Sequence, residues 1–394
     1  MLPAYYEFRS ATKILSGTNA IEHIVFELAN LGVTRPLVIT DKRIRSLGLT
    51  EVVLDALADS KLELPIVFDD VPVDSSVDTA NAVARTYAEQ GCDGIIAVGG
   101  GSVLDTAKGA CIVIATDGSD LMAHRGSEVL CNAPFPPLIA VPTTAGTGSE
   151  VTGAAVIKDT DREVKMAFVS FDLQPQVAVL DPRMTLGLPP RITASTAMDA
   201  LVHAVEAASG RQRNPLSDAY AFAAIDLVRE NLSAVLTDGR DARVRLAMAN
   251  AALMAGIAFS NAMVGVVHAI GHACGGVAHV AHGDAMAILL PHCMSFNLDV
   301  CAEEYARLLL PLAGPAAFAA TPPAERPAAA IAAVRELLAN CANLGELPLT
   351  LSAVGVTEAQ LPDIARVAID DASVSFNPRD VSLEDALGIL RAAL

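Results

Sequence analysis

The chain has 394 residues, of which 52% are hydrophobic and 18% are charged. One hydrophobic core seldom supports a chain of this length, so two domains are expected, each with a sizeable core. The net charge of −18 disfavours nucleic acid and anionic membranes as partners, because both would be repelled.

The start of the chain, MLPAYYEFRSATKIL, lacks the charged and apolar regions of a signal peptide. No stretch of about 20 residues is apolar and free of charges or helix breakers, so no membrane-spanning helix is expected. The seven cysteines form no CxxC pair and indicate free thiols in a reducing compartment. A soluble, cytoplasmic protein is therefore expected.

The first half alternates short apolar runs with segments of helical periodicity. Strands are predicted at residues 36–40, 64–68, 94–101, 137–144 and 177–182, and helices at 44–60, 76–90 and from Val103 onward. This alternation is typical of βαβ units and predicts a parallel sheet of the Rossmann-like kind.

The character of the sequence changes near residue 184, where strand-like runs give way to long segments rich in alanine and leucine. Helices are predicted at residues 190–210, 214–236, 240–263, 264–276, 284–300 and 327–343. The proline-rich residues 311–330 are predicted to form a surface loop that leads into a helix. The predicted fold is an α/β domain over residues 1–183, followed by a helical domain over residues 184–394.

A glycine-rich turn in GIIAVGGGSVLDTAK joins a predicted strand to a helix. It contains Gly99, Gly100 and Gly101, and the helix starts with Ser102. Glycines let the backbone approach a ligand closely, and the free N–H groups and dipole of the helix start favour a phosphate. The turn therefore indicates an anion site, although such turns also use glycine for geometric reasons alone. It matches neither the GxGxxG fingerprint nor a P-loop.

A second loop, PTTAGTGSEVT, follows another predicted strand. Its hydroxyl groups are able to donate hydrogen bonds to ribose or phosphate, and they belong to Thr143, Thr144, Thr147, Ser149 and Thr152. The alternative is a polar turn that caps a helix.

Asp41 ends the first predicted strand, where a carboxylate can bind the ribose hydroxyls of an adenosine and repel a 2′-phosphate. This favours NAD over NADP. Asp41 is equally suited to cap a helix, and the basic residues Lys42, Arg43 and Arg45 beside it leave NADP open.

Histidines and a carboxylate recur at helical spacing in the second half. Asp199 and His203 lie four residues apart in AMDALVHAVEA, and His268 and His272 repeat that spacing further along. A lone histidine in an apolar helix is usually a hydrogen-bonded core residue, and His279 and His292 are assigned to that class.

The number of these groups in one part of the sequence indicates more than core histidines with structural roles. Six histidines and an aspartate between positions 199 and 292 need many partners, whereas one shared cation satisfies several of them at once. Imidazoles and a carboxylate suit Fe²⁺, Zn²⁺, Ni²⁺ or Mn²⁺. The scarcity of thiolates argues against a structural cysteine-type zinc site.

Four motifs in this order resemble the iron-containing, or group III, alcohol dehydrogenase family: GGGSVLDTAK, PTTAGTGSEVT, MDALVHAVEA, and GVVHAIGHACGG continuing to HGDAMAILLPH. The resemblance covers essentially the whole chain. It implies a dinucleotide-binding α/β domain and a helical metal-binding domain, an architecture shared with dehydroquinate synthase, with cofactor and metal meeting in the cleft between them. It also implies a homodimer or a higher homo-oligomer.

The resemblance implies roles for individual residues. The metal ligands would be Asp199, His203, His268 and His282, and His272 would take part in proton transfer. The cofactor-binding residues would be Asp41, Gly99, Gly100, Gly101, Ser102, Thr143, Thr144, Thr147, Thr152 and Lys165.

The chain departs from the family pattern at three places. Many members read Pro-Asn-Pro where this chain has VPVDSS at residues 71–76, so the asparagine contact near the adenosine is missing. The usual proline before the last metal histidine is Ala281. An uncommon aspartate, Asp284, follows Gly283 and is expected to alter the surroundings of the metal or the substrate pocket.

The expected chemistry is hydride transfer between a small alcohol or diol and NAD, with a divalent ion acting as a Lewis acid on the alcohol oxygen. His272 would carry the proton. A synthase of the dehydroquinate type is disfavoured, because residues 196–206 and 263–292 contain no Lys or Arg for a phosphorylated acidic substrate. Two more functions are compatible with the same residues: a transhydrogenase that retains NAD, and a non-catalytic binding protein.

Overall fold

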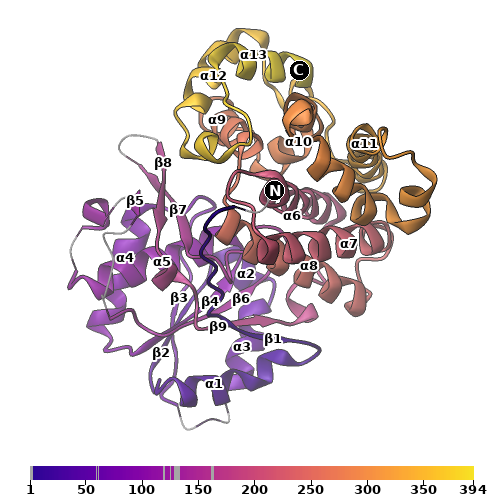
Figure 1. Ribbon diagram of the computed structural model, residues 1–394. Helices are drawn as coiled ribbons and strands as arrows, with labels where there is room; N and C mark the ends of the chain where they lie inside the picture. Colours follow the sequence, from indigo (N-terminus) through magenta and orange to yellow (C-terminus); the bar gives the residue numbers. More distant parts are fainter. Residues whose placement is uncertain are drawn as a thin grey trace. The chain divides into compact units, whose positions relative to one another are not determined.

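The structure is a computed structural model that describes residues 3–58, 60, 62–118, 120–124, 126–127, 134–160 and 164–394. The chain divides into two compact units, Arg9–Gly187 and Leu188–Leu394, and the second unit also includes Met1–Phe8. The first unit is built on a parallel sheet and the second is helical (Figure 1), which confirms the predicted fold class. The sequence predicts domains over residues 1–183 and 184–394, and this division stays a prediction.

The first unit is centred on a six-stranded sheet whose strand order is β1-β9-β6-β4-β2-β3. Its strands are β1 (Lys13–Ser16), β2 (Pro36–Ile39), β3 (Ile66–Phe68), β4 (Gly94–Gly99), β6 (Leu138–Pro142) and β9 (Val177–Leu180). Every pairing between them is parallel. The last five strands lie within the predicted ranges, whereas β1, a short edge strand with exposed side chains, was not predicted.

Helices cover both faces of this sheet. They are α1 (Ile24–Asn30), α2 (Lys42–Ser46), α3 (Leu49–Ala58), α4 (Val77–Glu89) and α5 (Gly101–Ala115). In β4, Ile95 and Ala97 pack into one apolar cluster with α4 and α5, and Ile96 and Val98 pack into another with α1 and α3. Successive side chains point to opposite faces of a strand, so this continuous apolar run is what a sheet covered on both faces requires.

A small second sheet in the same unit was not predicted. It contains β5 (Gly126–Ser127), β7 (Ala154–Asp159) and β8 (Val164–Val169) in the order β5-β8-β7, with β7 and β8 antiparallel. Alternate residues of β7 are buried, and Ile157 lies so close to α5 that a Cβ on Gly109 would be 2.4 Å from its Cδ1. The missing side chain of Gly109 therefore lets this sheet pack against α5.

The second unit consists of helices. They are α6 (Pro190–Ser209), α7 (Pro215–Thr237), α8 (Ala242–Ala262), α9 (Val266–Ala278), α10 (His282–Ala320), α11 (Arg326–Gly345), α12 (Leu361–Ile369) and α13 (Leu383–Ala393). The loop predicted for residues 311–330 is wrong over most of its length, because α10 continues to Ala320 and α11 starts at Arg326. The backbone is not helical at Cys301 and Gly314, and the second of these bends directly precedes Pro315, one of the prolines that suggested a loop.

Helix α6 lies in the middle of this unit and contacts α7, α8, α10 and α11. It is buried without interruption from Ala197 to Ser209. A helix surrounded on all sides has no solvent-facing stripe for polar residues, so any polar side chain on it needs a partner inside the protein.

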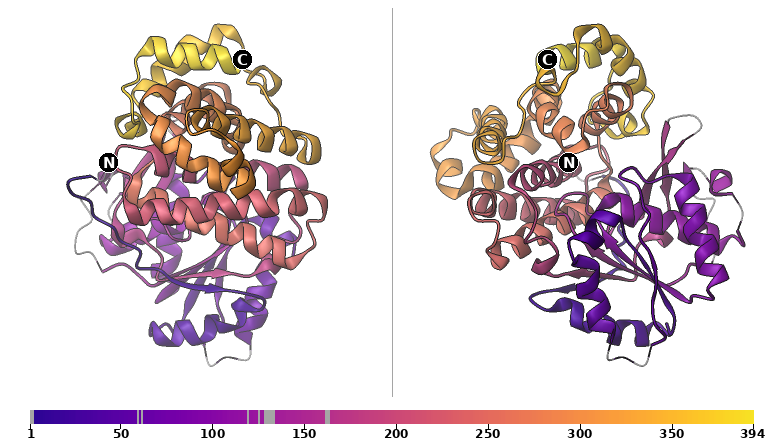
Figure 2. Two further views of the ribbon diagram at one scale, coloured as in Figure 1. Left: turned by 45° about the vertical axis from the view of Figure 1, so that its right-hand side comes forward. Right: turned by 180° about the vertical axis from the view of Figure 1, so that it is seen from behind.

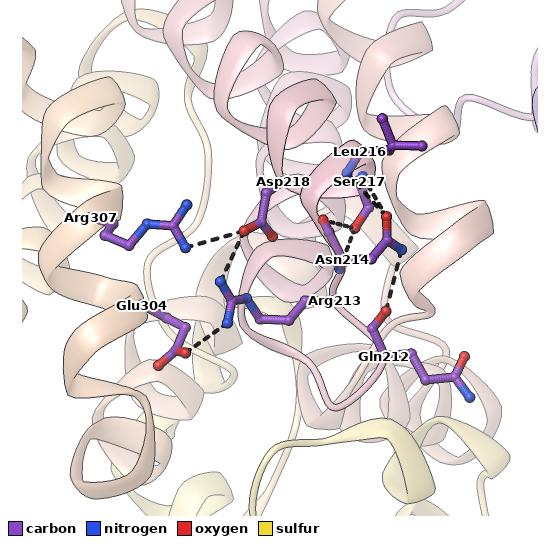
Figure 3. A network of polar contacts seen from close by, with 8 residues as sticks. All are labelled: Gln212, Arg213, Asn214, Leu216, Ser217, Asp218, Glu304 and Arg307. Carbon is purple, nitrogen blue, oxygen red and sulfur yellow. Dashed lines mark hydrogen bonds and ion pairs between the residues drawn. The ribbon is translucent and has the colours of Figure 1, made fainter. Parts of the chain in front are cut away.

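The start of α7 is fixed by a polar network, which Figure 3 shows. Asn214 caps the helix in a reciprocal capping box with Ser217. The network then joins α7 to α10 through the ion pairs of Arg213, Asp218, Glu304 and Arg307. Arg213 is only 13% exposed and bonds both carboxylates, so the pairs are shielded from solvent more than ordinary surface pairs.

Two helices of this unit, α8 and α10, are long and apolar enough to cross a membrane by length and composition alone. More than half of each apolar window is buried inside the protein, and α8 lies beside α7 in both views of Figure 2. Burial of this extent is typical of helices in a protein core. The six cysteines among the described residues are buried and free, in agreement with the predicted thiols.

Replacing Leu37 by alanine is expected to destabilise the first unit by about 2–5 kcal/mol, because Leu37 is fully buried on β2 and the change leaves a cavity. Leu64→Ala is the matched control, since Leu64 is 90% exposed and its loss removes little packing. Urea unfolding of both variants measures the difference. Equal unfolding midpoints would contradict the assignment of Leu37 to the core.

Candidate functional site

The buried helix α6 carries Asp199 and His203 on one face. They lie four residues apart and are only 2% and 5% exposed. His203 Nδ1 lies 3.9 Å from Asp199 Oδ1, and the ring of Phe259 stacks on His203 with 4.2 Å between centroids. The pair therefore sits in apolar surroundings, where an ionised carboxylate needs compensation.

Two further histidines reach Asp199 from other helices. His268 lies on α9, and His282 is the first residue of α10. One donor atom from each of Asp199, His268 and His282 lies within 4.8 Å of the others, and His282 Nε2 is 3.3 Å from Asp199 Oδ1. His203 is outside this group of three, but its ring stacks on His268 with centroids 4.6 Å apart. The structure thus brings together all four residues predicted as metal ligands.

The donor atoms of this cluster fit a cation. Asp199 Oδ1, His203 Nδ1 and His268 Nε2 are buried and have no hydrogen-bond partner within the described part of the chain. Burial lowers the pKa of His203 to about 3 and that of His268 well below its usual value, so both imidazoles are neutral. Burial also raises the pKa of Asp199, but the contact with His282 Nε2, 3.3 Å from Oδ1, outweighs it, so the pKa is lowered overall and the carboxylate is ionised. These are the protonation states in which such side chains bind metals.

Glu206, one turn after His203 on α6, was not among the predicted site residues. Its Oε2 atom lies 2.6 Å from His268 Nδ1, and Oε1 accepts a hydrogen bond from Val267 N at 2.7 Å. A carboxylate that binds the far nitrogen of an imidazole fixes the tautomer and aims the other nitrogen, here Nε2, at the cluster. A buried glutamate in the apolar run AVEA was the available signal.

His272, the predicted proton-transfer residue, lies beside the cluster. Its ring stacks on His282 with centroids 5.5 Å apart, and its side chain is 30% exposed. Its Nδ1 is 2.9 Å from Asp371 Oδ2, and Asp371 Oδ1 accepts a hydrogen bond from Ser373 N. Asp371 was also not predicted from the sequence, because it lies 99 residues from His272 in a segment without a recognised motif.

The glycine turn of the first unit has the close packing that its composition predicts. A Cβ on Gly99 would be 2.5 Å from Val103 Cγ2, and one on Gly101 would be 3.0 Å from Thr147 Cγ2. Gly100 is the N-cap of α5 and provides no side chain to cap it. The N–H groups at the start of α5 are therefore available to an anionic ligand.

The second loop is placed beside the first by strands β4 and β6, which are neighbours in the sheet. Thr143 N donates a hydrogen bond to Gly99 O, and Thr144 lies in van der Waals range of a Cβ built on Gly100. Thr143 Oγ1 is buried and has no partner among the described residues. The structure thus brings together the glycine turn and three predicted threonines, Thr143, Thr144 and Thr147.

Thr152 has a different environment from those threonines. It is buried, and its Oγ1 accepts a hydrogen bond from Lys108 Nζ, which also donates to Ser149 Oγ and to Ala154 O. Lys108 is fully buried on α5 and holds the end of the loop through these three bonds of 2.8–2.9 Å. A contact between Thr152 and a cofactor stays a prediction.

Asp41 takes the capping role that the sequence left open. Its Oδ1 accepts a hydrogen bond from Ile44 N at the start of α2, which leaves Oδ2 for another donor. The neighbouring Lys42 pairs with Asp70, and Arg45 pairs with Asp69. The positive charges beside Asp41 are therefore partly neutralised by the protein itself.

Ser102 and Lys165 both bind the segment that departs from the family pattern, residues 71–76. Ser102 Oγ donates a hydrogen bond to Val73 O, and Lys165 Nζ on β8 forms an ion pair of 2.8 Å with Asp74. The segment thus lies next to the start of α5, and Asp74 supplies a carboxylate there. The lysine predicted to face the cofactor is engaged in this exposed pair.

Comparison with known proteins agrees with these features. Residues 11–182 match the model of the family "Iron-containing alcohol dehydrogenase", and residues 193–394 match the model "Fe-containing alcohol dehydrogenase family, C-terminal". The chain is 39% identical to a 1,3-propanediol dehydrogenase of Klebsiella pneumoniae over 96% of both chains. It is 34% identical to an NAD-dependent methanol dehydrogenase of Bacillus methanolicus over 96% of this chain and 97% of the relative.

A similar solved structure is that of a 1,3-propanediol oxidoreductase. It superposes with a TM-score of 0.94, is 35% identical, and covers 99% of this chain and 100% of its own. The likeness therefore extends over both units.

Replacing Glu150 by glutamine is expected to stabilise the protein increasingly as the pH rises from 4.5 to 7. Burial raises the pKa of Glu150 to about 7, so the folded protein keeps a proton that the unfolded chain releases near 4.5. Wild-type stability therefore falls with rising pH in this window, whereas glutamine imitates the protonated acid. Urea unfolding at several pH values measures the difference.

Glu89→Gln is the control for this prediction, because Glu89 is exposed on α4. Its stability curve should run parallel to that of the wild type. A Glu150→Gln curve that also stays parallel from pH 4.5 to 7 would contradict the raised pKa.

Proposed function

Because the chain belongs to the iron-containing alcohol dehydrogenase family, we propose that it interconverts small primary alcohols or diols and the matching aldehydes, using a divalent metal ion and NAD. Membership supports oxidoreductase activity on small alcohols. The metal, the cofactor and the residue roles are inferred from the two clusters described above.

One observation carries the proposal: the donor atoms of Asp199, His268 and His282 converge within 4.8 Å, and those of Asp199 and His268 are buried without partners in the described part of the chain. His203 is the fourth ligand in the proposal, with its free Nδ1 3.9 Å from the same carboxylate. A divalent cation held there supplies Lewis acidity that lowers the pKa of an alcohol hydroxyl. We assign Fe²⁺ on the basis of the family, and Zn²⁺, Ni²⁺ and Mn²⁺ suit the same donor set.

The first unit provides the features expected of a dinucleotide site. The uncapped start of α5 suits a pyrophosphate, and the free oxygen of Asp41 suits ribose hydroxyls. Lys42 and Arg45 are each paired with an aspartate, which reduces their attraction for a 2′-phosphate. These features support NAD as the cofactor, as does the 34% identity to a relative named as an NAD-dependent methanol dehydrogenase.

His272 is the proposed proton carrier. Asp371 binds its Nδ1, so Nε2 is the nitrogen that exchanges a proton with the solvent or the substrate. The partial exposure of His272 allows such exchange, whereas the burial of His268 prevents it. Phe259 adds an apolar wall next to His203, which suits short aliphatic substrates, including diols of the kind named for the relatives.

Replacing His268 by alanine is expected to remove bound metal and turnover while leaving NAD binding largely unchanged, because metal and dinucleotide are held by different units. Elemental analysis of anaerobically purified protein measures the metal, NADH fluorescence titration measures cofactor binding, and NAD reduction with 1,3-propanediol measures turnover. His292→Ala is the control, because His292 lies outside the cluster. Loss of both metal and NAD binding with an intact fold would refute this division of labour.

Replacing Asp41 by serine is expected to shift cofactor preference from NAD towards NADP. Serine keeps the cap of α2 but removes a charged acceptor for the ribose, so kcat/KM for NAD should fall by about tenfold or more. The value for NADP should rise, because the carboxylate no longer repels its phosphate. Steady-state kinetics with both cofactors provide the measurement.

Asp55→Ser, an exposed change on α3, is the matched control and should leave the ratio of the two kcat/KM values as in the wild type. An Asp41→Ser protein that also keeps the wild-type ratio would remove Asp41 from the cofactor site.

A further inference from the structure

Asp284, the aspartate that departs from the family pattern, lies in the first turn of α10, two residues after His282. Its Oδ1 accepts hydrogen bonds from Arg191 Nη1 at 2.8 Å and from Ser195 Oγ at 3.1 Å, and its Oδ2 accepts one from Arg191 Nη2. Only 5% of the residue is exposed. Both oxygens are thus used in a bidentate ion pair of defined geometry, in which the carboxylate is buried and the arginine side chain is 36% exposed.

The partners of Asp284 belong to the helix that holds the metal ligands. Arg191, Ser195, Asp199 and His203 follow one another at intervals of four residues on α6, so they form one ridge along that helix. The start of α10 runs along the same ridge. His282 Nε2 lies 3.3 Å from Asp199 Oδ1, and Asp284 binds Ser195 and Arg191 one and two turns further back.

Gly283, between these two residues, allows the close approach. A Cβ at this position would be 2.4 Å from Ser195 Oγ and 2.7 Å from Ser195 O, distances that real side chains do not reach. The N-cap residue Ala281 provides no side-chain hydrogen bond to α10. The position of the first turn is therefore determined by contacts with α6 and not by a cap of its own.

We propose that Asp284, Arg191 and Ser195 are positioning residues that fix the register between α10 and α6 and thereby hold His282 against Asp199 for metal binding. The inference rests on the proposed function, because it concerns the same metal site. His282 needs such support, since its side chain is 41% exposed, whereas Asp199, His203 and His268 are buried. Because these three residues hold His282 in place before the metal binds, less side-chain entropy is lost on binding.

The test measures metal binding directly. Full-length apo protein, prepared with a chelator, is titrated with Zn²⁺ in competition with a chromophoric chelator, and with Co²⁺, whose visible absorption reports the coordination geometry. Asp284→Asn should weaken Zn²⁺ binding by about tenfold, the lower end of what supporting residues of metal sites contribute. Arg191→Met should have a similar effect, and the two effects should not add, because both changes break one interaction.

Arg191→Met leaves the buried carboxylate of Asp284 without its partner and risks unfolding, so the double variant Arg191→Met/Asp284→Leu is measured as well. It contains neither charge and is expected to fold. It should still bind Zn²⁺ about tenfold more weakly than the wild type and alter the Co²⁺ spectrum. Arg191→Lys, which keeps a charge but loses the bidentate pair, should fall between the wild type and Arg191→Met.

Arg366→Met/Asp363→Asn is the matched control, because this ion pair is exposed, lies within α12 and does not join α10 to α6. It should bind Zn²⁺ as the wild type does. If the double variant at positions 191 and 284 folds and keeps the wild-type Zn²⁺ affinity and Co²⁺ spectrum, the proposed positioning role of Asp284 and Arg191 is wrong. A wild-type protein without a tight site for either ion overturns the proposed function itself.

Discussion

The constraint on which the helical unit depends is the burial of Asp199 in a helix that has neighbours on all sides. A carboxylate in that position has to be compensated, and the chain places His203, His268 and His282 around it. Burial keeps His203 and His268 neutral, so their lone pairs and the carboxylate face one another without enough protons to satisfy them. Such an arrangement is stable with a shared cation and strained without one. The proposed metal ion would therefore offset the cost of burying these groups.

Two outer carboxylates turn this cluster into an oriented site. Glu206 receives the far nitrogen of His268, and Asp371 receives that of His272. The two histidines share a helix and the same kind of partner, yet they differ in exposure, 4% against 30% for the side chains. The buried histidine is suited to permanent coordination and the exposed one to proton exchange. Environment, and not residue type, separates the two roles.

The sequence predicted the elements whose signals are local. Five strands of the large sheet, the helices from α6 to α9 and the i, i+4 pairs Asp199/His203 and His268/His272 follow from periodicity, spacing and glycine turns, whereas the full set of four metal ligands was implied only by the family resemblance. It failed where tertiary contacts decide. The small sheet packs through the fit between Gly109 and Ile157, and α10 continues past Pro311 and Pro315 with a bend at Gly314. Asp371 reaches His272 only through the fold, which no local pattern reports.

Some motif residues are placed to bind a ligand, whereas others hold the protein's own loops in position. The sequence alone does not distinguish the two groups. Lys108 closes the motif GGGSVLDTAK, where a lysine near a glycine turn suggests a contact with phosphate. The structure instead buries it and uses all three of its donors within the protein, on Ser149, Thr152 and Ala154. Its charge therefore cannot serve a ligand without breaking the bonds that hold the second loop. A phosphate bound at this turn, as proposed, would therefore be held by the backbone N–H groups at the start of α5, which depend on glycine and not on lysine.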